Sequence, residues 1–206
     1  MKKKIVVFGG TFNPIHRAHL RIAGFLLRKF RPDKILFIPC NIPYHKTCEE
    51  VIDSRHRMEM VCQVIKHEPR FDISDIEIKR GGKTFSVETM KALKRQYPVG
   101  TRFYFVIGTD SLVDLPRWYE INKLIKLCQL ITIARPGYPF NKLVQKLPFS
   151  AGILKSIKQL YQPNPEINIS STLIRKNIKE HKSIKSLVTV VVEHYIKEHK
   201  LYKLRT

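Results

Sequence analysis

Short apolar segments alternate along this chain with longer segments whose apolar residues recur every three to four positions. Four of the apolar segments are 3–8, 35–38, 103–107 and 130–134. Such runs predict buried strands, and the recurring pattern predicts helices between them. Strands that alternate with helices pair in parallel and are covered on both sides. The sequence therefore predicts an α/β protein, a Rossmann-like doubly wound, mostly parallel sheet with helices on both faces.

The remaining segments complete this expected pattern. Helices are predicted at 18–30, 55–65, 87–95, 120–127 and 171–178. Strand-like alternation marks 71–78, and 167–169 predicts a brief strand. The segment 138–165, which holds four prolines, is predicted to be irregular. The valine-rich end, 184–204, leaves helix and strand open, with a helix slightly favoured.

Charge and cysteine usage restrict the class of protein. The chain has 38 basic and 17 acidic residues, a net charge of +21, which indicates an anionic partner. The basic residues are spread along the chain without an arginine-rich arm, so specific nucleic-acid recognition is not favoured. No apolar run is long enough to span a membrane, and the apolar start is too short for a signal peptide. The four scattered cysteines predict reduced thiols in a cytoplasmic protein; they are Cys40, Cys48, Cys62 and Cys128.

The segment GGTFNPIHRAH follows the first predicted strand. Gly9 and Gly10 allow a tight turn with outward-facing N–H groups, and the next helix offers its positive N-terminal end. His16 and His19 are three residues apart, so they project to one side of that helix. With the Thr11 hydroxyl nearby, they predict a polyphosphate pocket. A capped strand–helix junction with two surface histidines is the alternative for this motif taken alone.

A second candidate cradle for phosphate is ISSTLIR, late in the chain. Ser171 and Thr172 lie at the start of a predicted helix, and Arg175 follows on adjoining surface. Hydroxyls, N–H groups and a guanidinium at a helix start suit phosphate oxygens, although helix capping alone explains the hydroxyls as well. We expect the early and late motifs to converge over one edge of the sheet.

A third candidate segment is FYFVIGTDSLVDLPRWYEI. Its strand ends at Gly108, which lets a ligand approach the backbone, and Asp110 can accept hydrogen bonds from a ribose. Trp118, the single tryptophan, suits either core packing or stacking on an aromatic ring.

The combination of GGTFNPIHRAH, VIGTDSL with LPRWYE, and ISSTLIR resembles the nucleotidyltransferase superfamily with its HxGH and ISSTxxR motifs. More narrowly, the chain is similar to the bacterial nicotinate-nucleotide adenylyltransferases. The likeness continues through IPCNIPYHK, SRHRMEM, TFSVETMKAL, ARPGYP and YIKEHKLY, so it covers essentially the whole chain. It implies a single nucleotidyltransferase domain over 1–206, with a helical part from about 171 to 206.

This resemblance implies adenylyl transfer from ATP to nicotinate mononucleotide, giving deamido-NAD and pyrophosphate in NAD biosynthesis. It also implies Mg²⁺ bound through the substrate phosphates rather than by protein ligands. The 5′-phosphate is already a competent nucleophile, so catalysis consists mainly of alignment and charge neutralisation. The oligomeric state is left open, and a homo-oligomer is compatible with the sequence.

The family's site residues carry over to matching positions of this chain. The implied catalytic residues are His16, His19 and Arg175, with His19 the first choice for the α-phosphate contact. The implied ATP-binding residues are Gly9, Gly10, Thr11, Phe12, His16, His19, Gly108, Asp110, Arg135, Ile169, Ser171, Thr172 and Arg175. The implied residues for nicotinate mononucleotide are Asn41, Lys46, Ser86 and Trp118, with Trp118 stacking on the pyridine ring.

Four positions depart from the family pattern. Asn13 stands where Asp is usual, Ala18 where Gly is usual, Tyr44 where Pro is common, and Ser86 where Thr is usual. Asn13 keeps hydrogen-bonding capacity but loses a charge, and Ala18 is expected to add a methyl group beside the phosphates. We interpret these changes as variation within an active enzyme.

Other functions remain as alternatives. The acceptor for the same chemistry is open between nicotinate mononucleotide, nicotinamide mononucleotide and phosphopantetheine, although a phosphopantetheine enzyme would lack the Trp118 segment. A basic nucleic-acid-binding module on a Rossmann-like sheet is an alternative of a different class, but it leaves both phosphate motifs unexplained. A catalytically inactive ligand sensor differs from the enzyme in turnover alone.

Overall fold

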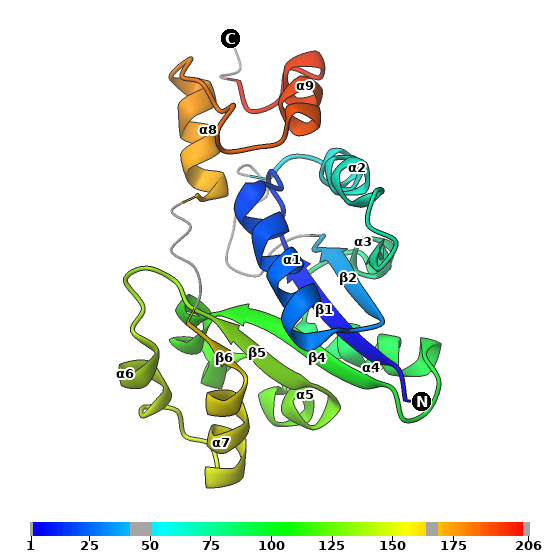
Figure 1. Cartoon of the computed structure of the whole chain (residues 1–206), viewed down its shortest axis with the longest axis vertical. Coiled ribbons are helices and arrows are strands. Elements are labelled where there is room, and N and C mark those ends of the chain that lie inside the picture. Colours follow the sequence, from blue (N-terminus) through cyan, green and yellow to red (C-terminus); the bar gives the residue numbers. More distant parts are fainter. Residues whose placement is uncertain (1, 42–50, 164–168, 204–206) are drawn as a thin grey trace. The chain divides into compact units, whose positions relative to one another are not determined.

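The strands of the computed structural model, which describes residues 2–41, 51–163 and 169–203, form a six-stranded sheet in the order β3-β2-β1-β4-β5-β6 (Figure 1). The pairings β1–β4, β4–β5, β5–β6 and β2–β3 are parallel. This strand order is that of Rossmann-like sheets, and the predicted fold class is confirmed. The strands are β1 (Lys4–Gly10), β2 (Lys34–Pro39), β3 (Phe71–Ile73), β4 (Arg102–Gly108), β5 (Gln129–Ile133) and β6 (Tyr161–Gln162).

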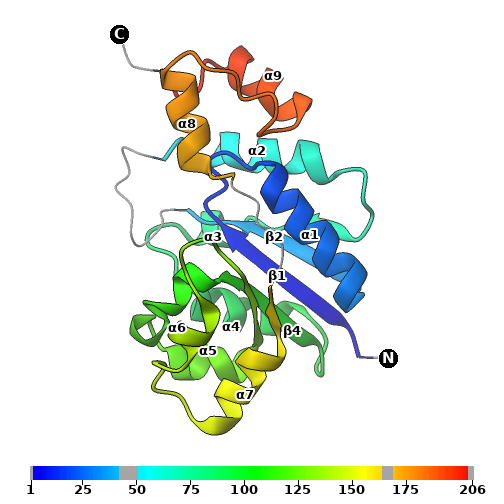
Figure 2. The same cartoon turned by 60° about the vertical axis from the view of Figure 1, so that its left-hand side comes forward.

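The helices alternate with these strands along the chain (Figure 2). They are α1 (Arg17–Phe30), α2 (Ser54–Ile65), α3 (Ile76–Arg80), α4 (Ser86–Gln96), α5 (Ile121–Leu127), α6 (Phe140–Val144), α7 (Ala151–Gln159), α8 (Ser171–Lys179) and α9 (Val190–Glu198). Two short 3-10 helices, η2 (Thr109–Leu112) and η3 (Leu115–Arg117), follow β4. The five helices predicted from the sequence are confirmed within one or two residues as α1, α2, α4, α5 and α8, and α9 decides the valine-rich end in favour of a helix.

The segment 71–78 departs from the prediction, because only its first three residues form a strand. Ser74 Oγ accepts a hydrogen bond from the Ile76 N–H at 3.3 Å, and α3 begins there. Lys79 and Arg80 lie in the last turn, where positive side chains complement the helix dipole, and Gly81 follows with a φ of +70°. The hydrogen bond of Ser74 therefore turns the chain into a helix instead of continuing the strand, and the Asp75 side chain makes no capping hydrogen bond.

The prediction that 138–165 is irregular is wrong, because this segment contains α6, α7 and β6. Two of its prolines border these elements rather than interrupt them: Pro139 immediately precedes α6, and Pro148 lies three residues before α7. Proline is well tolerated at such positions because no helical hydrogen bond is lost there. The strand predicted at 167–169 falls mainly outside the described residues, and Ile169 itself is not in a strand.

The described residues group into two compact units. One comprises 2–8, 32–34 and 85–163, and the other comprises 9–31, 35–41, 51–84 and 169–203. The organisation of 1–206 as a single domain stays a prediction. No helix in the described parts of the chain has the length and apolar character needed to cross a membrane.

The core of the first unit is built on β4 and β5. Their registered residues include Phe105 opposite Leu130 and Val106 opposite Ile131, all of them buried. β4 has apolar residues at every interior position, as expected for a strand covered on both faces. Its carboxyl end therefore brings Gly108 and the polar residues after it to the edge of a rigid strand.

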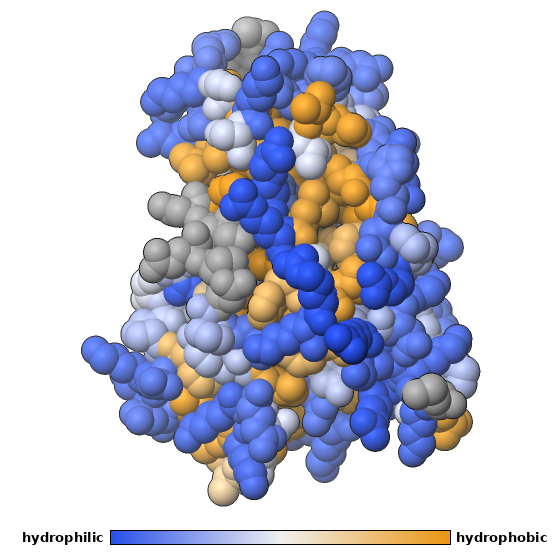
Figure 3. Space-filling view, in the orientation of Figure 1, coloured by the Kyte–Doolittle hydropathy of each residue, from blue (hydrophilic) through white to orange (hydrophobic). Residues whose placement is uncertain are grey.

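In the second unit, α1 buries one side and exposes the other. Its buried residues are Ala18, Ile22, Ala23, Leu26 and Leu27. Its exposed basic residues contribute to the hydrophilic band that runs along the helix in Figure 3. α2 packs against α9, where His56 Nδ1 lies 2.9 Å from the Tyr195 hydroxyl. The main-chain N–H of Arg17 donates to the Leu187 oxygen at 3.0 Å, which fixes the start of α1.

Candidate active site

In the loop after β1, the ring of Phe12 lies close against Gly10. A Cβ atom on Gly10 would lie 3.2 Å from the ring of Phe12, which is tighter than an ordinary contact, so the ring position favours glycine there. Phe12 is buried and has a φ of +47°, a region that bulky residues rarely adopt. Its ring contacts His19 edge-on at 5.0 Å and Phe37 at 5.9 Å. Because this ring belongs to the core, Phe12 has only its main chain to offer a ligand.

The two histidines of the motif stack on one another at the start of α1. Their ring centroids are 3.7 Å apart with an interplanar angle of 21°. The main-chain N–H of His16 donates to His19 Nδ1 at 3.3 Å, so a neutral His19 carries its proton on Nε2. His16 is only 3% exposed, whereas His19 is partly exposed. His19 is therefore the imidazole better placed to donate to a ligand.

The start of α8 lies directly against the loop after β1. Arg175 Nη1 donates to the main-chain oxygen of Asn13 at 3.0 Å, and Ser171 Oγ donates to the oxygen of Pro14 at 2.9 Å. Arg175 Nη2 lies 3.5 Å from Thr172 Oγ1, and Ser170 caps the helix by accepting from the Leu173 N–H. The early histidine loop and the late arginine helix therefore adjoin, as the sequence led us to expect.

A tyrosine near the end of the described chain, Tyr202, interacts electrostatically with this arginine. Tyr202 is buried, and its hydroxyl has no hydrogen-bond partner among the described residues. Burial raises the pKa of Tyr202, while the positive charges of Arg175 and Arg57 act in the opposite direction. The phenol is thus within electrostatic reach of both guanidinium groups.

A second group of predicted residues gathers at the end of β4. A Cβ atom on Gly108 would lie 2.0 Å from Asp110 Oδ1 and 3.1 Å from side-chain atoms of Arg135, so both side chains converge beside this glycine. Thr109 Oγ1 accepts from the main-chain N–H of Arg135 at 2.9 Å. The buried Nε of Arg135 has no hydrogen-bond partner within the described segments. Only glycine leaves room for this arrangement.

The aromatic residues after η3 are only partly buried. Trp118 is half-buried and meets Phe105 edge-on with ring centroids 6.4 Å apart. Tyr119 is 53% exposed and packs on Phe85, which immediately precedes Ser86 at the start of α4. Trp118 therefore both packs on the sheet and keeps exposed surface, which leaves stacking on a ligand open.

The remaining predicted residues are scattered. Asn41 Nδ2 donates to the main-chain oxygen of Gly82 at 3.2 Å. Gly9, Thr11 and Ile169 are partly exposed. Lys46 and Tyr44 lie outside the described residues.

The predicted site residues are divided between the two compact units. Those at the loop after β1, at the end of β2 and on α8 lie in the unit that contains α1. Those at the end of β4, at the start of α4 and after β5 lie in the unit that contains β4. Within each unit, most of these residues gather near one another: His16, His19, Ser171, Thr172 and Arg175 in the first case, and Gly108, Asp110 and Arg135 in the second.

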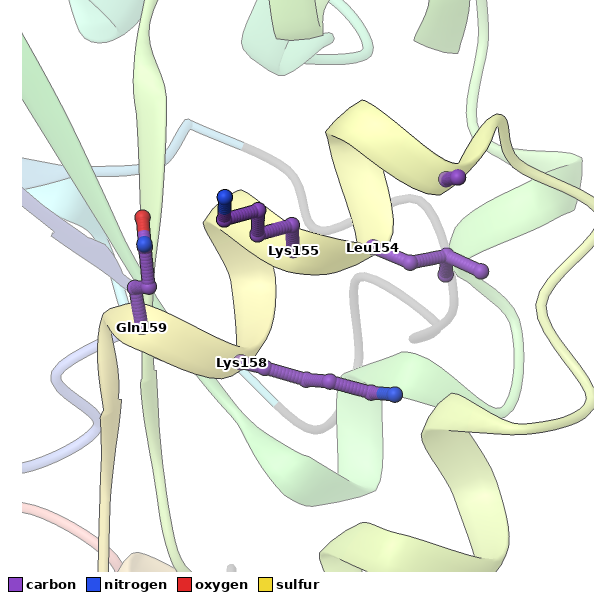
Figure 4. A pocket seen from close by; sticks show the side chains of 5 residues that line it. Leu154, Lys155, Lys158 and Gln159 are labelled. Atoms are coloured by element: carbon purple, nitrogen blue, oxygen red, sulfur yellow. The ribbon is translucent and has the colours of Figure 1, made fainter.

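No group of metal-binding side chains is found among the described residues, and a hollow on α7 lies apart from the predicted site residues. The described residues contain no group of three or more His, Cys, Asp or Glu side chains placed to hold a metal ion. A shallow hollow is lined by residues of α7 alone, and no predicted site residue lines it (Figure 4). The exposed side chains of Lys155 and Lys158 leave this helix in different directions, so they do not converge on one ligand.

Comparison with known proteins identifies the family. A model of the cytidylyltransferase-like family matches residues 7–177. A protein of Dehalococcoides mccartyi named probable nicotinate-nucleotide adenylyltransferase is 38% identical over 202 residues, 97% of each chain. The nicotinate-nucleotide adenylyltransferase of Bacillus subtilis is 36% identical over 201 residues, 98% of this chain and 99% of that one. This chain belongs to the nicotinate-nucleotide adenylyltransferase family.

The fold agrees with solved structures of proteins named for the same activity. Plasmodium falciparum nicotinic acid mononucleotide adenylyltransferase complexed with NaAD superposes with a TM-score of 0.76 at 23% identity, covering 97% of both chains. The same protein complexed with APC gives a TM-score of 0.75 at 22% identity. At these identities the likeness concerns the fold.

Two departures from the adenylyltransferase family pattern have a structural explanation here. Asn13 is buried, its Oδ1 accepts from the Ile52 N–H at 3.4 Å, and Arg175 binds its main-chain oxygen. An aspartate offers the same acceptors, so neither contact depends on the side-chain charge. Ala18 is fully buried on the core side of α1, so its methyl group packs inside the protein rather than beside a ligand.

Sequence reasoning missed one buried arginine of this site, Arg57 on α2. Its guanidinium hydrogen-bonds the main chain of both the loop after β1 and the end of β2. The available signal was its place on the buried stripe of the helix, four residues before Val61 and eight before Ile65. A charged residue on such a stripe indicates a buried polar role.

Proposed function

We propose that this protein transfers the adenylyl group of ATP to nicotinate mononucleotide, giving deamido-NAD and pyrophosphate in NAD biosynthesis. The observation that carries the proposal is the contact between the early histidine loop and the start of α8, through Arg175 and Asn13. Relatives named for this activity align over nearly the full length, and a neighbour of the same fold is complexed with NaAD, the product.

In this proposal the triphosphate lies against the loop after β1 and the start of α8. His19 donates from Nε2 to the α-phosphate, and Arg175 neutralises charge on the phosphate oxygens. The N–H groups at the start of α8 and the Thr172 hydroxyl supply further donors. Gly9, Gly10 and Thr11 contribute main-chain groups, which suits a loop held this tightly.

The reaction needs little chemistry from the protein itself. An oxygen of the mononucleotide 5′-phosphate attacks the α-phosphorus of ATP, and the bond from that phosphorus to the bridging oxygen of the β-phosphate breaks. Pyrophosphate departs with the electron pair, and no proton has to be removed from the nucleophile. His19 and Arg175 then act by aligning the phosphates and stabilising their charge, the principal means of catalysis in phosphoryl transfer.

Mg²⁺ fits this site only as a companion of the nucleotide. The residue at the carboxylate position of the family loop is Asn13, and its Oδ1 already accepts a main-chain hydrogen bond. Magnesium typically keeps several waters and binds nucleotide phosphates with few protein ligands. When bound, the ion would neutralise charge on the triphosphate, while the residues of this chain orient it.

The residues at the end of β4 are assigned to the adenosine half of ATP. Asp110 accepts hydrogen bonds from the ribose, and the unpartnered Nε of Arg135 supplies a donor beside it. Gly108 allows the nucleotide to approach the main chain. Phe12 and Ile169 are also assigned to ATP binding, and Phe12 contributes only its main chain.

The acceptor subsite is assigned to Asn41, Lys46, Ser86 and Trp118. Trp118 offers its exposed surface to the pyridine ring. Asn41 and Ser86 offer hydrogen-bonding groups, and Lys46 a charge for the acidic acceptor. The choice of nicotinate over nicotinamide follows the names of the curated relatives.

The test is pyrophosphate release from ATP and Mg²⁺ with three acceptors compared side by side: nicotinate mononucleotide, its amide and phosphopantetheine. We expect turnover with nicotinate mononucleotide well above the other two. Preference for either of the other two would show that the proposed acceptor is wrong. Absence of turnover with all three would refute the proposed enzymatic activity. The nucleic-acid alternative is tested separately, because it predicts DNA or RNA binding that weakens steeply with salt.

The cytoplasmic location and a homo-oligomeric state stay predictions. Three of the four cysteines lie in the described residues and are free thiols, in line with a reducing compartment. The high positive charge suits attraction of two anionic substrates.

A further inference from the structure

Arg57 is a fully charged side chain enclosed in the protein. It lies in the first turn of α2 and is only 1% exposed. Burial lowers the pKa of Arg57, yet a guanidinium stays protonated in proteins. No carboxylate of the described residues forms an ion pair with it, and its acidic neighbour Asp53 is bound to the exposed Arg55. Burying such a charge is costly unless hydrogen bonds compensate.

Main-chain oxygens supply the compensation. Nε donates to the oxygen of Ile52 at 3.1 Å, and Nη1 donates to the oxygens of Thr11 at 2.8 Å and Cys40 at 2.6 Å. Nη2 donates to the oxygen of Asn41 at 2.8 Å. These bonds use all but one of the guanidinium N–H groups. Three separate segments therefore meet at one side chain.

Two of these segments are the ends of strands at the proposed site. Thr11 follows β1, and Cys40 and Asn41 follow β2; the Cys40 N–H also donates to the Gly10 oxygen at 2.9 Å. Because the N–H and C=O of a trans peptide point in opposite directions, a carbonyl turned toward Arg57 turns the next N–H away from it. Arg57 thus sets the direction of the amide groups at both strand ends.

The loop after β1 has a strained main chain that neighbouring residues must hold in place. Phe12 follows the Thr11 carbonyl with its φ of +47°, a strained value for an aromatic residue. Strained conformations persist only when their surroundings hold them. The short bond from Arg57 to the Thr11 oxygen supplies one such constraint.

We propose that Arg57 is a positioning residue for both substrates, an inference that rests on the proposed adenylyl transfer. It touches neither substrate. Its guanidinium holds the loop assigned to ATP and the strand end assigned to nicotinate mononucleotide in one geometry, so that the two phosphates meet in line.

This role predicts a kinetic signature that lost stability alone does not produce. Without Arg57, both strand ends relax, and kcat/KM falls for ATP and for nicotinate mononucleotide together. Misplaced reacting groups lose on the order of tenfold to a hundredfold in rate. A purely structural arginine would instead lower the melting temperature and leave the kinetic constants of the folded fraction unchanged.

The experiment compares Arg57→Met and Arg57→Lys with two controls on the same helix. Arg55→Met removes an arginine whose side chain is 89% exposed, and Met60→Ala opens a cavity at a fully buried position. Kinetics are measured below the melting temperature of every variant. We expect Arg57→Met to lose kcat/KM for both substrates by at least the factor above, and Arg57→Lys to lose less. Arg55→Met should keep both stability and kinetics, and Met60→Ala should lose stability alone.

A rescue measurement covers the case in which Arg57→Met does not fold. Millimolar guanidinium added to Arg57→Ala should restore part of the activity, because the ion can occupy the vacated space and bind the same carbonyls. It should have no such effect on Met60→Ala. Kinetic constants of folded Arg57→Lys equal to wild type, together with no rescue, would overturn the proposal. So would equal kinetic losses in Met60→Ala and Arg57→Met.

Failure of this inference is distinct from failure of the proposed function. Turnover by the wild-type protein tests the proposed function, and the Arg57 variants test the positioning role of Arg57. If the wild type released no pyrophosphate with any acceptor, calorimetric binding of Mg-ATP would still test Arg57. Arg57→Met should then weaken Mg-ATP binding relative to wild type and Met60→Ala, and unchanged binding would refute the role.

Discussion

Arg175 and Asn13 are joined by a 3.0 Å hydrogen bond although 162 positions separate them in the sequence. The bond runs from the guanidinium to a main-chain oxygen, so one side of Arg175 is committed to the loop after β1. Its Nη2 lies 3.5 Å from Thr172 Oγ1, and a planar fork of this kind suits a phosphate. Arg175 thus links the shape of the loop to the charge offered to a ligand.

Replacement of Arg175 should separate these two contributions. We expect Arg175→Ala to lower kcat on the order of a hundredfold, as removal of a charge-stabilising group does. Arg175→Lys keeps the charge but has a single ammonium for loop and phosphate, so it should recover only part of the loss. Pyrophosphate release under saturating substrates measures both. Unchanged turnover in Arg175→Ala would remove this residue from the catalytic set.

The hydrogen bond from the His16 N–H to His19 Nδ1 makes a specific prediction for the imidazole. If His19 binds the α-phosphate as proposed, its donor is Nε2. A glutamine places its amide nitrogen near the Nε2 position and an asparagine near Nδ1. We expect His19→Gln to retain more kcat than His19→Asn, with a loss in the latter on the order of a hundredfold. Equal activity of the two variants would contradict the assignment of Nε2.

A side chain at Gly108 should disturb the proposed adenosine subsite. A Cβ atom there would lie 2.0 Å from Asp110 Oδ1 and 3.1 Å from Arg135, so Gly108→Ala must displace both side chains. We expect a higher KM for ATP with a smaller change for nicotinate mononucleotide. Gly152→Ala is the control, since a Cβ atom on this exposed glycine of α7 would meet no neighbouring atom within 4 Å. That change should leave KM unaltered and stabilise the helix by about 1 kcal/mol at most.

The single tryptophan gives a direct optical test of the acceptor subsite. Trp118 is half-buried, so its fluorescence responds to a ring stacked on its exposed surface. We expect nicotinate mononucleotide to quench this emission and ATP alone to affect it less. Trp118→Phe should raise KM for the mononucleotide more than for ATP, with Tyr119→Phe as the control. Quenching by ATP alone, without any by the mononucleotide, would place the pyridine ring elsewhere.

The regular elements of this fold were largely predictable from apolar pattern, because the interiors of β1, β2, β4 and β5 and one side of α1, α2 and α4 are buried as expected. Shorter segments were not. The alternation at 71–78 is compatible with either state, and the side chain of Ser74 decides it locally by accepting from the Ile76 N–H. In 138–165 the prolines favoured an irregular segment and so concealed the helical pattern of α7, which buries Ile157.

The meeting of the early and late motifs was predictable because both have a recognisable pattern of residues, whereas the roles of His19 and Arg175 stay predictions. Contacts to main-chain oxygens leave no motif. The support given by Arg57 depends on which carbonyls the fold turns toward it, and no residue pattern encodes that directly. Ala18 shows the same limit. It stands beside the histidines in the sequence, but its side chain is buried on the core side of α1, which the motif does not reveal.

The atoms that accept hydrogen bonds from Arg57 are main-chain oxygens, so they are present whatever amino acid stands at the accepting position. Mutation at Thr11, Cys40 or Ile52 can therefore accumulate without removing an acceptor, whereas the arginine itself has no substitute of equal reach. Substitution is therefore tolerated at each residue that supplies an acceptor oxygen, but not at Arg57 itself. A relative that is 36% or 38% identical to this chain can therefore differ at these three positions and still offer the same main-chain acceptors.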